Sequence, residues 1–170
     1  MRALTANAWT ALALVCALGP AAGAAEAPTG VVFRTIARGG GVIPVARARD
    51  RLEVIKDSAR WRHLWSTLPG VTGPPPRIDF AREMVVGVVL QRGSSGHEVE
   101  IVRVEERSNA IAVEFKETTP GRDCGARPTF FELYHLVRLP KSDKRVLFDK
   151  TLRHHCPKSR GDLARVRAAF

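Results

Sequence analysis

A turn of small and polar residues, Gly93-Ser94-Ser95-Gly96-His97, contains residue types that serine hydrolases use. A serine nucleophile needs a histidine base beside it and an acid that orients the base. The spacing here lacks the GxSxG pattern, and no strand-to-helix passage surrounds it. Serines next to glycines are ordinary residues of a hairpin loop. We therefore interpret the segment as a turn and assign no catalytic residue to the chain.

Histidines and cysteines in the second half of the chain raise the question of a metal site. The candidate ligands are His135, His154, His155, Cys156 and Cys124. Zinc sites normally contain closely spaced ligand pairs such as CxxC or HxxxH, which this set lacks. Adjacent residues of an extended segment point to opposite sides, so His154 and His155 are poorly placed to share one ion. We expect no metal and no other cofactor.

Residues 1–24 have the layout of a secretory signal peptide. Arg2 precedes an apolar run from Ala8 to Leu18, and Ala22-Gly23-Ala24 is a small-x-small cleavage site. The run is shorter than the ~20 residues that a membrane-spanning helix needs. Cys16 lies inside this run, so it fits a removed cysteine better than the acylated cysteine of a lipoprotein. We expect a mature chain that is exported to the periplasm or beyond; an uncleaved N-terminal anchor is the alternative.

Removal of the signal would leave two cysteines, Cys124 and Cys156. Two cysteines in an oxidising compartment most simply pair with each other. Closing a loop of about 30 residues stabilises a fold by roughly 3–4 kcal/mol on chain-entropy grounds. We therefore predict a disulfide bond between Cys124 and Cys156.

The composition is basic, with 27 Lys and Arg against 17 Asp and Glu and a formal net charge of +10. For an exported protein, the anionic neighbours are lipid headgroups, cell-wall polymers and acidic proteins. The charges are scattered along the chain and are not gathered with aromatic residues, which argues against nucleic acid as a partner. Diffuse surface charge is the simplest interpretation.

One amphipathic helix is predicted, from Asp57 to about Leu68. The Asp57 side chain is suited to cap the first turn. The apolar residues recur at helical spacing and form one stripe: Trp61, Leu64, Trp65 and Leu68. Such a stripe usually docks onto a sheet, although two tryptophans on one face could also form a ligand platform.

The remaining pattern predicts strands. Residues 84–90 are apolar on both faces and should lie in the middle of a sheet, followed by an antiparallel meander through 97–105 and 111–116. Residues 129–148 alternate with a period of two and predict a hairpin, with His135 on the apolar face as a hydrogen-bonded core residue. The glycines at 39–41 predict a turn that ends the strand over 31–36.

These elements together predict an α+β fold. We expect a mainly antiparallel sheet of about six or seven strands, with the amphipathic helix packed on one face. Residues 25–170 should form a single domain, which can bury enough surface for one core. A short C-terminal helix is predicted over 162–170.

Several segments resemble the C-terminal domain of the protease complex subunit PrcB family. They are RWRHLW, IDFAREMVVGVVLQRGSSGHEVEIVRVE, KETTPGRDCG and YHLVRLPKSDKRVLF, which together span about residues 52–148. The resemblance implies a small, exported and often lipid-anchored protein without its own catalysis. The family's namesake is an accessory subunit of a surface protease complex, so a binding or assembly role is implied.

The resemblance also suggests residues for a partner surface: His97, Tyr134 and Arg138. His97 stands where the family usually carries an aromatic residue, so recognition in this chain would differ. We expect a non-catalytic, exported accessory domain that binds a protein partner in the cell envelope, such as a protease. The alternative is an envelope ligand module that binds anionic glycan or lipid.

Overall fold

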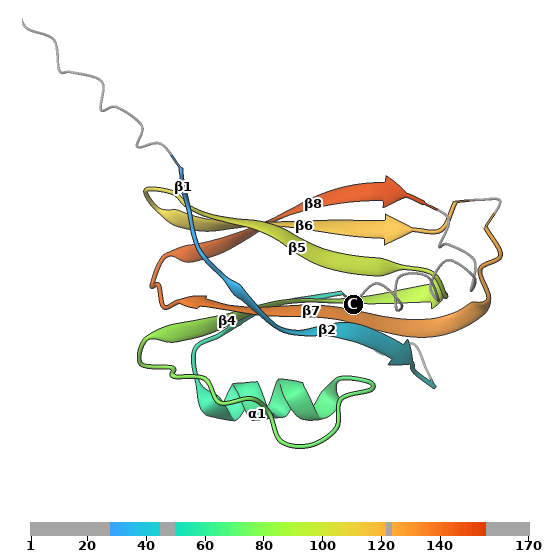
Figure 1. The fold of residues 1–170 in the computed structure, drawn as a ribbon, viewed down its shortest axis with the longest axis horizontal. Coiled ribbons are helices and arrows are strands. Elements are labelled where there is room, and N and C mark those ends of the chain that lie inside the picture. Colours follow the sequence, from blue (N-terminus) through green and yellow to red (C-terminus); the bar gives the residue numbers. More distant parts are fainter. Residues whose placement is uncertain (1–27, 45–49, 122–123, 156–170) are drawn as a thin grey trace, which may run out of the picture.

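The computed structural model describes residues 28–44, 50–121 and 124–155. The predicted signal segment, Cys156 and the predicted C-terminal helix lie outside these ranges. The described chain is arranged in three layers, with two β-sheets stacked face to face and a helix beneath the second sheet (Figure 1). No helix within the described ranges has the length and apolar character needed to cross a membrane.

Eight strands and one helix make up the described fold. In chain order they are β1 (Thr29–Gly30), β2 (Arg34–Val42), β3 (Arg51–Ile55), α1 (Ser58–Thr67), β4 (Glu83–Ser94), β5 (Glu98–Glu106), β6 (Ala110–Thr119), β7 (Pro128–Pro140) and β8 (Arg145–His154).

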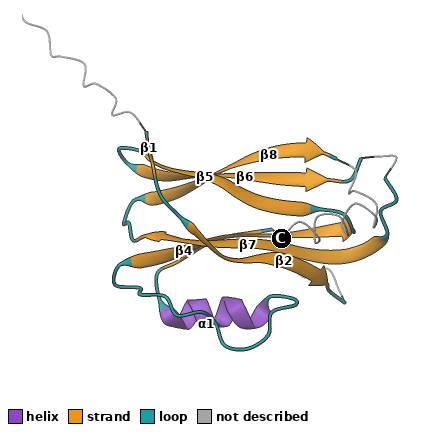
Figure 2. Cartoon of the chain, in the orientation of Figure 1, coloured by secondary structure: helices purple, strands orange, loops and turns teal. Residues whose placement is uncertain are grey.

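The strands divide equally between two sheets. The first sheet has the order β1-β5-β6-β8 and the second has the order β2-β7-β4-β3. All neighbouring strands are antiparallel except β6 and β8, which are parallel. The predicted class, a mainly antiparallel α+β fold with one helix on a sheet face, is confirmed (Figure 2). The described strands, expected in one sheet of about six or seven, are eight and form two sheets of four.

The main core lies between the sheets, and β7 shows how the sequence builds it. Its side chains alternate as predicted: Leu133, Val137 and Leu139 pack against the first sheet, whereas Tyr134 and Leu136 pack against α1. Strand β4 is buried on both faces and lies between β7 and β3, as its continuous apolar sequence predicts.

The predicted helix is confirmed as α1. Asp57 caps it, and its carboxylate accepts a hydrogen bond from the Arg60 backbone N–H at 2.8 Å. The indole N–H of Trp61 donates to the Pro76 carbonyl at 2.9 Å, and that of Trp65 donates to a carbonyl of the same proline-rich connector at 3.1 Å. Both tryptophans are buried, so their stripe docks α1 onto the second sheet and does not form an exposed platform.

The predicted hairpin over 129–148 is wrong in its pairing. Both strands exist, but β7 lies between β2 and β4, so neither of its edges is free to accept β8. Strand β8 pairs instead with β6 in the other sheet, and the intervening segment carries the chain between layers. The predicted meander is interrupted for the same reason, because β4 and β5 lie in different sheets, while β5 and β6 pair as expected.

The predicted break at the three glycines is also wrong, because 39–41 continue β2. A Cβ atom on Gly39 would lie 3.1 Å from the Tyr134 hydroxyl oxygen, and one on Gly40 would lie 2.6 Å from the Glu132 carbonyl oxygen. The glycines therefore allow β2 to approach β7 and its aromatic side chains closely, which is a common role of glycine inside a strand.

Candidate functional site

The core becomes charged at the end of the sandwich where β4, β6 and β8 finish. Glu117 of β6 continues the inward-facing series of Val113 and Phe115, and its side chain is 2% exposed. Arg92 of β4 binds it with two hydrogen bonds, one of them from Nη2 to Oε2 at 2.6 Å. Lys150 of β8 points inward and places its Nζ 2.5 Å from the same carboxylate. Glu117 is the fully buried member, whereas the Lys150 side chain is 42% exposed. We call Arg92, Glu117 and Lys150 the Glu117 charge cluster.

Two cations compensate Glu117 for the loss of water. Burial alone would raise the pKa of the Glu117 carboxyl, but the hydrogen bonds from Arg92 and Lys150 outweigh burial and lower this pKa to about 2. The carboxylate is therefore ionised at neutral pH and holds β4, β6 and β8 together. A buried charge of this kind requires such partners, because an isolated one costs several kcal/mol.

Ser94 and His97 lie beside this cluster but do not form a catalytic triad with it. Ser94 Oγ is 3.0 Å from His97 Nε2, whereas His97 Nδ1 is 3.7 Å from Glu117 Oε1, which is too long for a hydrogen bond. The buried Nδ1 atom has no hydrogen-bond partner among the described residues. A triad acid must hold and orient the histidine, and Glu117 is bound to two cations instead. Burial lowers the pKa of His97.

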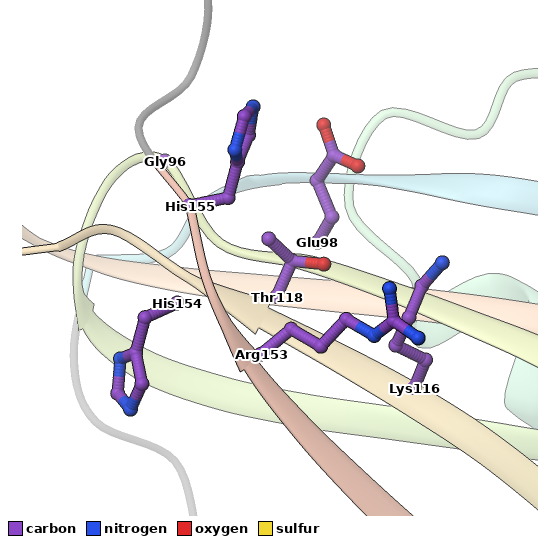
Figure 3. Close-up of a pocket in the computed structure, with 7 residues that line it drawn as sticks. All are labelled: Gly96, Glu98, Lys116, Thr118, Arg153, His154 and His155. Atoms are coloured by element: carbon purple, nitrogen blue, oxygen red, sulfur yellow. The ribbon is translucent and has the colours of Figure 1, made fainter.

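A polar hollow of about 320 Å³ opens on the outer face of the first sheet. Its lining comes from the turn before β5 and from β5, β6 and β8: Gly96, Glu98, Lys116, Thr118, Arg153, His154 and His155. In Figure 3 the side chain of Arg153 extends toward that of Lys116, and both line the hollow. We call this hollow the outer hollow.

The charges around the outer hollow are unevenly compensated. Lys116 Nζ lies 3.4 Å from a Glu100 carboxylate oxygen, and Glu98 lies 3.7 Å from Arg38, on β2 of the other sheet. Among the described residues, no acidic side chain forms an ion pair with Arg153. The hollow therefore presents a guanidinium that is free to bind an anion.

The histidines considered as metal ligands are separated in the structure. His154 and His155 point to opposite sides of the chain, as predicted, and His154 Nδ1 lies 2.8 Å from Thr119 Oγ1 (Figure 3). His135 is buried between the sheets, where both of its ring nitrogens have hydrogen-bond partners. The described residues contain no group of three or more candidate ligands that could hold a metal. The predicted Cys124–Cys156 pairing stays a prediction, because Cys156 lies outside the described residues.

The three residues suggested for a partner surface do not share one surface. Tyr134 is 5% exposed and belongs to the core between α1 and the second sheet. Arg138 is partly exposed, pairs with Val85 near the start of β4 and lies 3.5 Å from a Glu83 carboxylate oxygen. His97 follows the far end of β4. The described structure thus places Arg138 of β7 beside the start of β4 and His97 just beyond the end of β4.

Strand β8 forms a long open edge of the first sheet. It pairs with β6 over ten residues without a register shift, and no other described strand pairs with its outer side. The His155 N–H donates to the Thr119 carbonyl of β6 at 2.9 Å. Because alternate residues of a strand direct their backbone groups to opposite edges, the N–H groups of Phe148, Lys150 and Leu152 point outward. We call this the β8 edge.

Exposed apolar side chains lie along the β8 edge. Leu147 is 36% exposed and Leu152 is 50% exposed, on opposite faces of the strand. The sequence pattern predicted a strand here, but it placed the strand in a hairpin and so did not predict that an edge would be open.

Comparisons with known proteins give no match: no family model fits the chain, and neither the curated proteins nor the solved structures contain a significantly similar one. The resemblance to the PrcB C-terminal domain therefore depends on the quoted segments alone.

Proposed function

We propose that the chain is an exported, non-catalytic accessory domain that binds a protein partner in the cell envelope, such as a secreted protease complex. The observation that carries this proposal is the β8 edge, a regular ten-residue strand with an unpaired outer side among the described residues. Unpaired strand edges bind extended segments of other proteins by adding a strand to the sheet. The resemblance to an accessory-subunit family and the signal-like N-terminus agree with this role.

The hydrogen-bond and ion-pair partners of the interior polar groups support a role without catalysis. Glu117 is bound to Arg92 and Lys150, and both nitrogens of His135 are occupied. Ser94 has a histidine beside it, but that histidine has no acid within hydrogen-bond distance. The polar residues of the described core therefore stabilise the fold, and the exposed edge is left for recognition.

Co-purification with edge variants tests the proposal. Leu152→Pro removes an N–H that points outward, so it blocks strand addition without breaking a bond to β6. Leu152→Ala shortens the same side chain and keeps the N–H. Tagged wild-type protein and the alanine variant, expressed at native level, should retain the same partner, whereas the proline variant should lose it.

This comparison requires folded variants. Thermal unfolding and circular dichroism establish whether each variant is folded. If Leu152→Pro fails to fold, His154→Pro blocks the next outward-pointing position and replaces it. Recovery of the wild-type chain as a monomer without partner would overturn the binding role. Equal partner recovery by folded proline and alanine variants would overturn the assignment to the β8 edge.

The outer hollow favours a second candidate function, a module that binds anionic glycan or lipid. Lys116 and Arg153 line it together, and the chain as a whole is strongly basic. Co-sedimentation with phosphatidylglycerol vesicles or with isolated cell wall tests this function. Binding that disappears in moderate salt would support it, because surface charges are screened over about 10 Å at 0.1 M salt.

A further inference from the structure

We propose that the outer hollow binds an acidic side chain of the partner segment that adds to the β8 edge. This inference rests on the proposed function and names the chemistry of the partner: an extended peptide segment with a carboxylate near its end. The hollow and the edge meet at Arg153, which belongs to β8 and also lines the hollow.

Strand geometry places a partner side chain at the hollow. In an added antiparallel strand, the residue opposite Arg153 faces the same side of the sheet, with its Cβ atom about 4.5–5.5 Å from that of Arg153. Arg153 pairs in register with Thr118 of β6, and both line the hollow. A partner side chain at this position is therefore directed toward the hollow, on the face that also carries Lys116.

The charges of the hollow select an acid at this position. Arg153 has no ion-pair partner among the described residues, and the one carboxylate near Lys116, that of Glu100, also forms an ion pair with Arg38 of β2. A carboxylate accepts two parallel hydrogen bonds from a guanidinium, whereas an amide of the same shape offers one acceptor oxygen. His155 lines the same hollow and adds a second hydrogen-bonding group.

Peptide titrations followed by NMR test this inference. The probes are the five-residue peptide acetyl-Val-Glu-Val-Glu-Val-amide and its counterpart with glutamine in place of glutamate. The shifts of the outward-pointing amides of Phe148, Lys150 and Leu152 report strand addition at the β8 edge. We expect the glutamate peptide to bind roughly two- to fivefold more tightly than the glutamine peptide, as for a partly exposed ion pair.

Two matched variants locate the source of this preference. Arg153→Gln should abolish the preference for glutamate while the shifts of the β8 amides persist. Arg103→Gln removes an arginine from the same outer face, at a position that lines a different hollow, and should leave the preference intact. Circular dichroism verifies that both variants are folded.

The remaining outcomes separate the inference from the proposed function. Equal affinity of the two peptides, with shifts along β8, would overturn the selective hollow and leave the edge-binding role standing. A preference for glutamate that survives in Arg153→Gln would also overturn it. Absence of any β8 shift at millimolar peptide would overturn the inference, while the co-purification test would still decide the proposed function separately.

Discussion

The Nδ1 atom of His135 in β7 accepts a hydrogen bond of 2.7 Å from the backbone N–H of Ile101 in β5, and so ties the two sheets together. This N–H is available because β5 has a bulge between Ile101 and Arg103, which interrupts its pairing with β6. The other ring nitrogen, Nε2, lies 2.9 Å from Thr35 Oγ1. Because a backbone N–H only donates, His135 is neutral and carries its proton on Nε2.

The neutral state of His135 predicts that the fold loses stability in mild acid. Burial, helped by the nearby charge of Arg38, lowers the pKa of His135 to about 4, against about 6.5 for an unfolded histidine. The unfolded chain therefore binds a proton that the folded chain does not. The free energy of unfolding should fall from pH 6.5 toward pH 4 by up to about 3 kcal/mol. Urea denaturation at pH 7.5, 5.5 and 4.5 measures this change.

Replacement of His135 separates its contribution to the pH dependence of stability from the contributions of other titratable groups. His135→Leu keeps the bulk of the side chain but leaves the Ile101 N–H buried without a partner, which should cost roughly 1–3 kcal/mol at pH 7.5. The same variant should show a weaker loss of stability between pH 6.5 and pH 4. His63→Gln, at an exposed position of α1, is the control and should behave as wild type. A pH dependence unchanged in His135→Leu would contradict this account.

Glu117→Gln should be among the most destabilising single substitutions at the charged end of the core. It leaves Arg92 and Lys150 without the carboxylate that compensates them, and breaking a buried ion pair typically costs about 3–5 kcal/mol. Glu114→Gln changes a partly exposed acid of the same strand and should cost less than about 0.5 kcal/mol. Chemical denaturation at pH 7 compares them. A similar loss in both variants would show that the cluster does not stabilise the fold.

Gly40→Ala should destabilise the protein because the new Cβ atom would lie 2.6 Å from the backbone oxygen of Glu132. Relief requires β2 and β7 to separate, and overpacking of this kind typically costs about 1–3 kcal/mol. Gly93→Ala is the matched control, since no atom lies within 4 Å of its Cβ position. Thermal unfolding should therefore show a clear decrease in melting temperature only for Gly40→Ala. Equal melting temperatures would mean that the close strand approach is wrong.

Ser94 should not react as an activated nucleophile, although His97 lies 3.0 Å from its hydroxyl group. The distance from His97 to Glu117 leaves the imidazole without an orienting acid. Incubation with a fluorophosphonate probe, followed by intact mass spectrometry, should give no adduct. An adduct that disappears in Ser94→Ala would identify a serine hydrolase and contradict the non-catalytic proposal.

Local pattern was enough to predict the elements that depend on neighbours in the sequence. The helix was predictable because Asp57 caps its start and Trp61 and Trp65 fall on one stripe. The period of two in β7 correctly placed His135 on the apolar, inter-sheet face. In each case the residues that decide the structure lie within one element, so the sequence spacing contains the information.

Features that depend on distant residues were not predictable in this way. The hairpin prediction placed β8 beside β7, because nothing within residues 129–148 shows that both edges of β7 are occupied. Glu117 follows Phe115 by two residues in β6, so the two side chains lie on the same face of the strand. This spacing could have indicated a buried acid. Its partners Arg92 and Lys150 come from other strands, so only the assembled fold shows that the charge is compensated.

Hydrogen exchange on the captured complex tests the central claim, strand addition at the β8 edge, most directly. The account predicts that the outward-pointing amides of Phe148, Lys150 and Leu152 exchange more slowly in the complex than in the free protein. The inward-paired amides of β8, already bonded to β6, should change little. Unchanged exchange at these three amides, with new protection elsewhere on the described chain, would contradict the account.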